Sequence, residues 1–193
     1  MAAAPTGTRM TYAEYLAAEE RATEKHEFLD GFVYAMAGGT QEHGRLTLSF
    51  ARLLGNALEG RPCAAYSSDV RVRVQATGLT TYPDISVVCG ARASDAADPL
   101  AIVNPVLLVE VLSDSTEACD RGEKAAHYRH IPSLREYVLV SQKSRRLEVF
   151  RRNEAGRWEL FEFEAGQRAE LASVGCTVDV DAVYRDPLAA PAS

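Results

Sequence analysis

Four apolar stretches of the chain predict β-strands, and their patterns differ. Residues 70–74 alternate between Val and Arg, which is typical of a strand with one buried and one polar face. Residues 85–88 and 106–112 are almost continuous apolar runs, and residues 137–140 form a shorter run. Such runs are typical of central strands that are covered on both faces. The pattern therefore predicts a sheet whose middle strands are enclosed.

Helical spacing and capping signals predict three helices. A capping box begins at Thr11 and opens a short helix that runs to about Glu20. In residues 43–58 the apolar side chains recur at near-helical spacing, which predicts a long helix. We interpret Asp120 as the N-cap of a third helix, which continues to Ile131 because a proline follows.

Two hairpins and one crossover complete the pattern. Asp30 and Gly31 lie between two apolar runs, and this pair favours a two-residue turn because Gly accepts a positive φ. Residues 145–152 and 157–164 predict a C-terminal β-hairpin. The third helix joins two predicted strands and indicates a right-handed crossover between parallel neighbours. Together these elements predict an α/β fold with a mixed central β-sheet flanked by helices.

Length and composition restrict the class of protein. The chain has 193 residues, of which 47% are hydrophobic and 25% are charged, as in globular proteins. We expect a single domain over residues 10–185, with flexible termini at residues 1–9 and 186–193. The longest apolar stretch is far shorter than the roughly 20 residues of a membrane-spanning helix. With no secretion signal at the start, we expect a cytoplasmic protein without a membrane partner.

The four cysteines give no sign of a metal site. They stand at positions 63, 89, 119 and 176, with no C-x-x-C pair and no cluster with histidine at zinc-ligand spacing. We interpret this usage as that of a reducing compartment, and Cys89 as a small core residue of its strand.

Two acidic residues stand in the most apolar part of the chain. Glu110 interrupts the run 106–112, where an isolated carboxylate is costly unless it is neutral, paired or bound to a metal. Asp84 directly precedes the strand at 85–88, and if the two strands pair, both carboxylates project from one face as metal ligands. Hard oxygen ligands favour Mg²⁺ or Mn²⁺ over zinc. The alternative is that Glu110 lies at a sheet edge or pairs with a structural arginine.

Lys124 is the third candidate, because it lies in the helix that follows the strand of Glu110. Its ammonium group could reach back over the strand ends, where ligands usually bind in open α/β sheets. Beside two carboxylates it could position an attacking water, whereas a helical lysine taken alone is more often a solvated surface charge. His127 and His130 are weaker metal-ligand candidates, since no third ligand accompanies them.

Asp84 after a proline, Glu110 on the next apolar strand and then Lys124 resemble the PD-(D/E)XK nuclease pattern. In that superfamily the lysine normally stands two residues after the glutamate, where this chain has Leu112. The chain is more specifically similar to the Uma-type restriction endonuclease family, in which the following helix supplies the lysine. The segments that carry the similarity are 10–16 (MTYAEYL), 27–31 (EFLDG), 42–44 (EHG) and 108–116 (LVEVLSDST), with Asp120, Lys124 and Tyr128 after them.

The resemblance implies a restriction-endonuclease-like core and metal-dependent hydrolysis of phosphodiester bonds in DNA. Asp84 and Glu110 would ligate Mg²⁺ or Mn²⁺, the carbonyl of Val111 could join them, and Lys124 would orient water. Family position also makes Glu27 and His43 candidate ligands or supporting residues; the alternatives are a surface strand residue and a helix cap. A homodimer would suit cleavage of both strands of a duplex.

The charge distribution is uneven. The net charge of −6 gives no overall basic field for nucleic acid. Residues 121–157, however, contain ten basic and four acidic side chains. Arg71 and Arg73 could extend this basic surface, which would contact phosphates or simply keep an edge hairpin soluble. The basic residues on or beside the hairpin are Lys143, Arg145, Arg146, Arg151, Arg152 and Arg157.

Two other functions remain open. One is a catalytically inactive nuclease fold that binds nucleic acid or serves as a scaffold. Salt-dependent DNA binding without cleavage would favour it. The other is a metal-dependent hydrolase of a small phosphorylated molecule, which suits an acidic surface better than DNA does. Generic phosphodiester substrates would distinguish that activity from an endonuclease.

Overall fold

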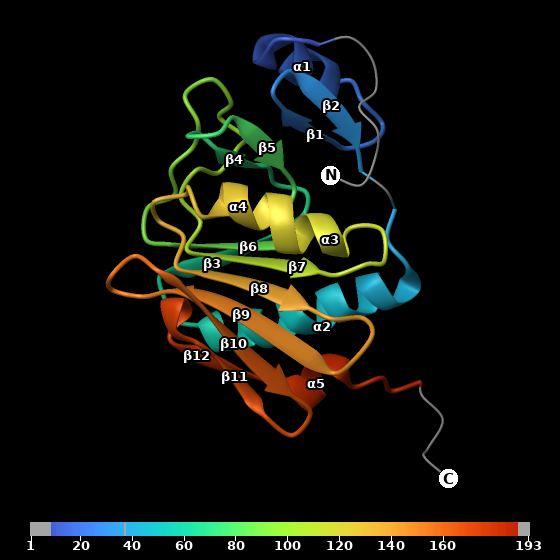
Figure 1. The fold of residues 1–193 in the computed structure, drawn as a ribbon, viewed down its shortest axis with the longest axis vertical. Helices are drawn as coiled ribbons and strands as arrows, with labels where there is room; N and C mark the ends of the chain where they lie inside the picture. The colour runs from blue at the N-terminus through green and yellow to red at the C-terminus, as the bar shows by residue number, and fades with distance from the viewer. Residues whose placement is uncertain (1–8, 37, 189–193) are drawn as a thin grey trace.

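A six-stranded mixed β-sheet runs through the middle of the protein (Figure 1). The computed structural model describes residues 9–36 and 38–188. The strand order is β10-β9-β8-β7-β6-β3, in which β7 and β8 are parallel and the other neighbours are antiparallel. The strands are β3 (Cys63–Ser67), β6 (Ile85–Cys89), β7 (Leu107–Val111), β8 (Glu136–Val140), β9 (Arg146–Arg152) and β10 (Trp158–Glu164). The predicted mixed sheet, crossover and C-terminal hairpin are confirmed.

The central strands β7 and β8 are buried along their whole length, as their apolar sequences predict. Successive side chains of a strand point to opposite faces. On β7, Leu107 and Val109 join one hydrophobic core, whereas Leu108 joins a second core on the other face. Glu110 shares the face of Leu108 because the two residues are two positions apart. The sheet thus separates two cores, and the carboxylate belongs to the second.

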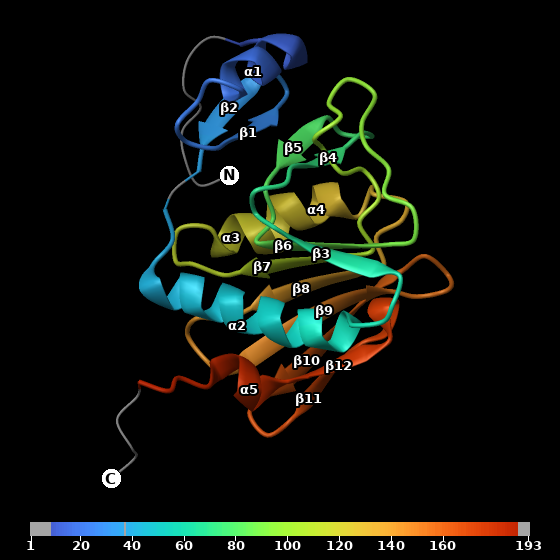
Figure 2. The ribbon, with the colours of Figure 1, turned by 180° about the vertical axis from the view of Figure 1, so that it is seen from behind.

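The long helix α2 (Gln41–Leu58) crosses the first face of the sheet (Figure 2). Its N-cap is Thr40, whose hydroxyl accepts a hydrogen bond from the His43 N–H at 3.1 Å. Leu46, Phe50 and Leu54 recur every four residues and are fully buried in the first core. The same core includes four C-terminal elements: β11 (Arg168–Leu171), a 3₁₀ turn (Ala172–Val174), β12 (Cys176–Asp179) and α5 (Val180–Tyr184).

A helical segment with an irregular turn packs against the second face. It consists of α3 (Glu117–Cys119), a π-helical turn (Asp120–Lys124) and α4 (Ala125–Tyr128). The Asp120 N–H donates to the Thr116 carbonyl at 2.9 Å, so Asp120 lies inside the helix rather than before it. The prediction that Asp120 caps this helix is therefore wrong. A cap would face solvent, whereas Asp120 is buried.

A smaller antiparallel sheet, with strand order β2-β1-β5-β4, lies beyond this helical segment (Figure 1, upper part). Its strands are β1 (His26–Leu29), β2 (Phe32–Ala35), β4 (Val72–Val74) and β5 (Leu79–Thr81), and helix α1 (Tyr12–Glu19) precedes β1 in the chain. Asp30 and Gly31 have φ values of 52° and 85°, which the predicted two-residue turn requires. Thr11 and Glu14 form the predicted capping box at the start of α1.

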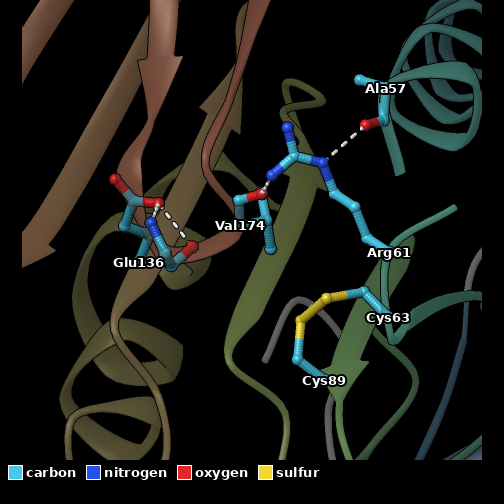
Figure 3. The surroundings of a disulfide bond; sticks show 7 residues. Ala57, Arg61, Cys63, Cys89, Glu136 and Val174 are labelled. Carbon is cyan, nitrogen blue, oxygen red and sulfur yellow. Dashed lines mark hydrogen bonds between the residues drawn. A yellow bond between two sulfur atoms is a disulfide. The ribbon is translucent and has the colours of Figure 1, made fainter. Parts of the chain in front are cut away.

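A disulfide joins Cys63 to Cys89 at the edge of the large sheet (Figure 3). The two residues face each other in the antiparallel pair β3–β6, with Cα atoms 4.0 Å apart. The interpretation of Cys89 as a simple core residue is therefore wrong. The disulfide could not be predicted because the sequence shows no strand pattern at 63–67 that would bring Cys63 beside Cys89. Close by, Arg61 donates to the carbonyls of Ala57 and Val174 and ties α2 to the 3₁₀ turn.

Two expectations concern the ends of the chain and membranes. The termini predicted to be flexible, residues 1–9 and 186–193, fall mostly outside the described residues. Among residues 9–36 and 38–188, no helix has the length and apolar character needed to cross a bilayer.

Candidate active site

A cleft of about 760 Å³ opens at the end of the large sheet to which the C-terminal ends of β7 and β8 point. Since two parallel strands carry their C-terminal ends to the same edge, the loops that follow them meet there. Residues 113–116 and 141–143 of these loops line the cleft, together with the first turn of α2. All three predicted site residues, Asp84, Glu110 and Lys124, also line it.

The carboxylates of Asp84 and Glu110 lie on one face of the sheet. Ile85 pairs with Val109 in the antiparallel register of β6 and β7, so Asp84 and Glu110 occupy the next pair of positions. The Asp84 N–H donates to Glu110 Oε2 at 3.3 Å, and the Val111 N–H donates to Asp84 Oδ2 at 2.7 Å. Strand pairing therefore brings the two acids together in the way that the sequence pattern predicts.

Glu110 is only 4% exposed. The Tyr128 hydroxyl donates to its Oε1 at 2.8 Å. Burial raises the pKa of the Glu110 carboxyl to about 8; Lys124 opposes this rise, whereas the negative charges of Asp120 and Asp84 add to it. The alternative that Glu110 lies at a sheet edge is wrong, because β7 has a neighbour on each side. A cation close to Glu110 would favour its ionised form.

The ammonium group of Lys124 is surrounded by carboxylates. Its Nζ lies 3.0 Å from Glu27 Oε1, 3.4 Å from Glu110 Oε1 and 3.5 Å from Asp120 Oδ1. Burial alone lowers the pKa of Lys124, but the neighbouring negative charges outweigh burial and hold that pKa well above its usual value. The side chain is 11% exposed, so Lys124 is a buried cation of the cleft and not a solvated surface charge.

Glu27 and His43 also reach the cleft. Glu27 is buried on β1 and pairs with Lys124, so it is not a surface strand residue. His43 Nε2 lies 3.2 Å from Asp84 Oδ2, and this hydrogen bond raises the pKa of His43. His43 is not the cap of α2 either, because Thr40 takes that position. Glu27 therefore contacts the predicted lysine, and His43 contacts the predicted Asp84.

Asp120 and Tyr128 join the site, although the sequence assigns no contact to either. Asp120 is 2% exposed, and its Oδ1 accepts no hydrogen bond from the described residues. Burial raises the pKa of Asp120, and the charge of Lys124 opposes this rise. Asp120, Lys124 and Tyr128 follow one another at intervals of four residues, which places them on one side of a helix. The family resemblance already includes both residues, and this spacing is the signal in the sequence that links them to Lys124.

Known proteins resemble the chain in sequence. The model of the Uma2 family, described as "Putative restriction endonuclease", matches residues 12–181. The chain belongs to this family. The resemblance carried by the sequence motifs is thereby confirmed, and it extends through the C-terminal hairpin to the start of α5.

Two relatives of this Uma2 chain are proteins of Synechocystis sp. that are described as uncharacterized. Protein slr1290 is 41% identical over 177 residues, or 92% of each chain. Protein sll1609 is 36% identical over 162 residues, which are 84% of this chain and 91% of the relative. A crystal structure described as "a putative nuclease belonging to DUF820", from Anabaena variabilis, covers 91% of this chain and 98% of its own with a TM-score of 0.73 at 14% identity. This likeness shows a shared α/β fold.

The donor atoms of the Uma2 cleft fit a hard divalent cation in their chemistry. Two carboxylates, of Asp84 and Glu110, stand beside the backbone of Val111, which also takes part in a hydrogen bond with His43. Among the described residues, no group of three or more Asp, Glu, His or Cys side chains is already arranged as a metal site. Mg²⁺ does not need such a group, because it commonly binds one or two carboxylates and keeps several waters.

Most of the basic residues predicted to contact phosphates are ion-paired. The pairs are Lys143–Glu117 (2.7 Å), Arg145–Asp181 (3.6 Å), Arg146–Glu148 (3.1 Å), Arg151–Glu136 (2.7 Å), Arg71–Asp98 (2.9 Å) and Arg73–Asp95 (3.5 Å). Arg71 and Arg73 therefore do not extend a free basic surface, since carboxylates of the same region neutralise both. His127 and His130 do not line the cleft.

Proposed function

We propose that this Uma2 protein is a metal-dependent endonuclease of the PD-(D/E)XK type that hydrolyses phosphodiester bonds of DNA. One observation carries the proposal: at the cleft, the ammonium of Lys124 lies 3.4 Å from Glu110, and Glu110 in turn contacts Asp84. The three residues come from a helix and two strands that are separate in the sequence. A buried acid with a second acid and a largely buried cation beside it is costly for stability, and such arrangements cluster at functional sites.

Each residue has a distinct part in the proposed mechanism. Asp84 and Glu110, with the carbonyl of Val111, would hold Mg²⁺ or Mn²⁺, which supplies Lewis-acid stabilisation and lowers the pKa of a bound water. Lys124 orients the attacking water and offsets the negative charge that develops on the phosphate in the transition state. Tyr128 fixes the orientation of the Glu110 carboxylate through its hydrogen bond.

The pairing of Lys124 with Glu27 serves this mechanism as well. Glu27 Oε1 lies 3.0 Å from Nζ, the shortest of the three contacts between that ammonium and a carboxylate. The contact anchors the long side chain from the side of the smaller sheet, opposite the strand that carries Glu110. Lys124 is therefore positioned before a substrate arrives, which reduces the reorganisation needed during the reaction.

The proposal is tested by cleavage of supercoiled plasmid and of single-stranded DNA with Mg²⁺ or Mn²⁺. We expect cleavage by the wild type, its loss in EDTA, and strongly reduced rates for Asp84→Asn, Glu110→Gln and Lys124→Met. Matched controls are Asp69→Asn and Lys25→Met, since these two residues form an exposed ion pair outside the cleft. Equal rates for site and control variants would contradict the assigned roles.

A nuclease fold without catalysis remains the second candidate. The observation that favours it is that the Lys124 ammonium already pairs with Glu27, Glu110 and Asp120 within the fold. DNA binding that weakens with salt, together with no cleavage under any metal, would support this candidate and contradict the endonuclease. Hydrolysis of a generic phosphodiester but not of DNA would instead indicate a small phosphorylated substrate.

A further inference from the structure

A second pocket, of about 510 Å³, lies at the end of the large sheet opposite the cleft. It is formed where α4 ends, β8 begins and the β9–β10 turn approaches, on the left in Figure 1. We call it the distal basic pocket, and its basic side chains are Arg129, His130, Arg135 and Arg152. It shares no lining residue with the cleft, so it is a separate feature of the surface.

The arginines of the distal basic pocket differ from their neighbours in their pairing. Arg146 and Arg151, on the same hairpin, are bound to Glu148 and Glu136. By contrast, no ion pair joins Arg129, Arg135 or Arg152 to a carboxylate in the described part of the chain. Glu154 is the single acidic residue among the described residues that line the pocket. Three guanidinium groups against one carboxylate leave an excess of positive charge that an anion can neutralise.

Backbone hydrogen bonds fix the positions at which Arg135 and Arg152 leave the sheet. The Arg152 N–H donates to the Arg135 carbonyl at 2.8 Å, which joins the end of β9 to the start of β8. The Arg135 N–H in turn donates to the Val106 carbonyl at 2.9 Å. The Arg152 guanidinium also contacts the Pro132 carbonyl at 3.4 Å. Two of the three arginines are therefore anchored through their backbones at this end of the sheet.

We infer that the distal basic pocket binds phosphates of a DNA backbone, a role that rests on the endonuclease function proposed above. Arginine pairs with phosphate through two parallel N–H donors, and a concave group of three suits closely spaced phosphates. No base-reading group is needed, so this contact is independent of sequence.

The distance between the two sites suits one DNA molecule. Glu110 pairs with Leu139 in the parallel register of β7 and β8, and Arg135 stands four positions before Leu139. Four strand residues extend about 13 Å, which is less than half of the roughly 34 Å that ten base pairs of a duplex extend. A duplex bound at the cleft is therefore long enough to reach the distal basic pocket as well.

The test measures DNA binding in EDTA, so that its result does not depend on cleavage. Fluorescence anisotropy of a labelled duplex is recorded from about 50 to about 200 mM salt. The pocket variant combines Arg129→Gln, Arg135→Gln and Arg152→Gln. The control combines Arg21→Gln, Arg52→Gln and Arg92→Gln, which are exposed, lie outside both pockets and change the net charge equally.

We expect the slope of log affinity against log salt to fall by about three units in the pocket variant, since each lost phosphate contact removes about 0.9. The control should keep the wild-type slope. A variant with lysine at the same three positions should retain most of the slope, which separates loss of charge from loss of folding.

Equal losses in the pocket and control variants would overturn the inference, because the effect would then be one of total charge. Displacement of the duplex by inorganic phosphate as readily as by unlabelled duplex would also overturn it, since the pocket would then be a site for free phosphate. An unchanged slope with cleavage intact would contradict this inference alone. A reduced slope in a protein that never cleaves DNA would contradict only the proposed activity.

Discussion

Two buried glutamates on neighbouring strands have opposite surroundings. Glu136 opens β8 and is completely buried, and it accepts hydrogen bonds from Arg151 at 2.7 Å and from the N–H groups of Ala172 and Ser173 at 3.1 and 2.8 Å. Glu110 lies near the end of β7 with one hydrogen bond under 3 Å, from Tyr128, and two longer contacts. Glu136 is thus satisfied within the fold, whereas Glu110 faces a cleft.

The comparison shows that burial of a carboxylate does not by itself indicate a catalytic or metal-binding role. Glu136 joins β8 and β9 to the 3₁₀ turn, so its charge is used to hold elements together. Around Glu110 the groups repel as well as attract, because Asp84 and Asp120 raise its pKa together with burial. A bound cation would therefore stabilise the ionised form of Glu110, whereas Glu136 already has a positive partner in Arg151.

The largest expected effect is on catalysis, from Glu110→Gln. Loss of one carboxylate at the proposed metal position should lower the rate of plasmid cleavage by roughly 10³-fold, or about 4 kcal/mol in transition-state stabilisation. The measurement is the initial rate of nicking in Mn²⁺, with Glu20→Gln on the exposed surface as the control. A rate within twofold of the wild type would break the contrast with Glu136.

The next effect is on stability, from Glu136→Gln. Removing this charge leaves Arg151 without its buried partner, and we expect the free energy of unfolding to fall by about 3 kcal/mol. Urea denaturation followed by circular dichroism measures the change. The folded fraction should still cleave DNA at the wild-type rate. If Glu110→Gln proved the more destabilising of the two substitutions, our comparison would be reversed.

Metal binding should produce a smaller effect that separates the same two residues. At a free Mn²⁺ concentration ten times its Kd, the wild type should gain about 1.4 kcal/mol of stability. Glu136→Gln should show the same gain, and Glu110→Gln should show none. Differential scanning fluorimetry with and without EDTA measures the shift in Tm. Equal gains in both variants would place the metal elsewhere.

The smallest effect concerns two tyrosines. Tyr128→Phe removes the hydrogen bond to Glu110 and should weaken Mn²⁺ binding by about tenfold, as loss of an orienting partner does. The control is Tyr184→Phe, since Tyr184 donates to the carbonyls of Ser141 and Arg146 and has no contact with the acids. Titration calorimetry compares their metal affinities. Equal affinities in the two variants would remove Tyr128 from the proposed site.

Much of the central fold follows from local patterns in the sequence. The continuous apolar run of β7 predicts a covered central strand, and Asp30–Gly31 predicts its hairpin with the observed positive φ values. The acids of the site could be predicted for a related reason: a carboxylate in such a run is conspicuous. In the sequence, Lys124 is a candidate only through its place in the helix after the strand of Glu110 and through the family resemblance, because a lysine on a helix has no distinguishing signal of its own.

The remaining features depend on contacts between distant segments. Glu27 meets Lys124 only because the smaller sheet packs beside the helical segment, and no local pattern indicates that packing. The disulfide needed the pairing of β3 with β6, whereas residues 63–67 show little alternation. Asp120 looks like an N-cap in the sequence because Asp is a preferred capping residue, and only the hydrogen bond from its N–H to the Thr116 carbonyl shows that the helix has already begun.

The crossover from β7 to β8 also has a consequence for how the protein folds. Glu110 meets Lys124 and Tyr128 across intervals of only 14 and 18 positions. Loop closure of that length is fast and entropically cheap, whereas Glu27 must arrive from a remote part of the chain. The contacts of Glu110 with Lys124 and Tyr128 therefore cost less chain entropy to form than the contact that Glu27 makes with Lys124.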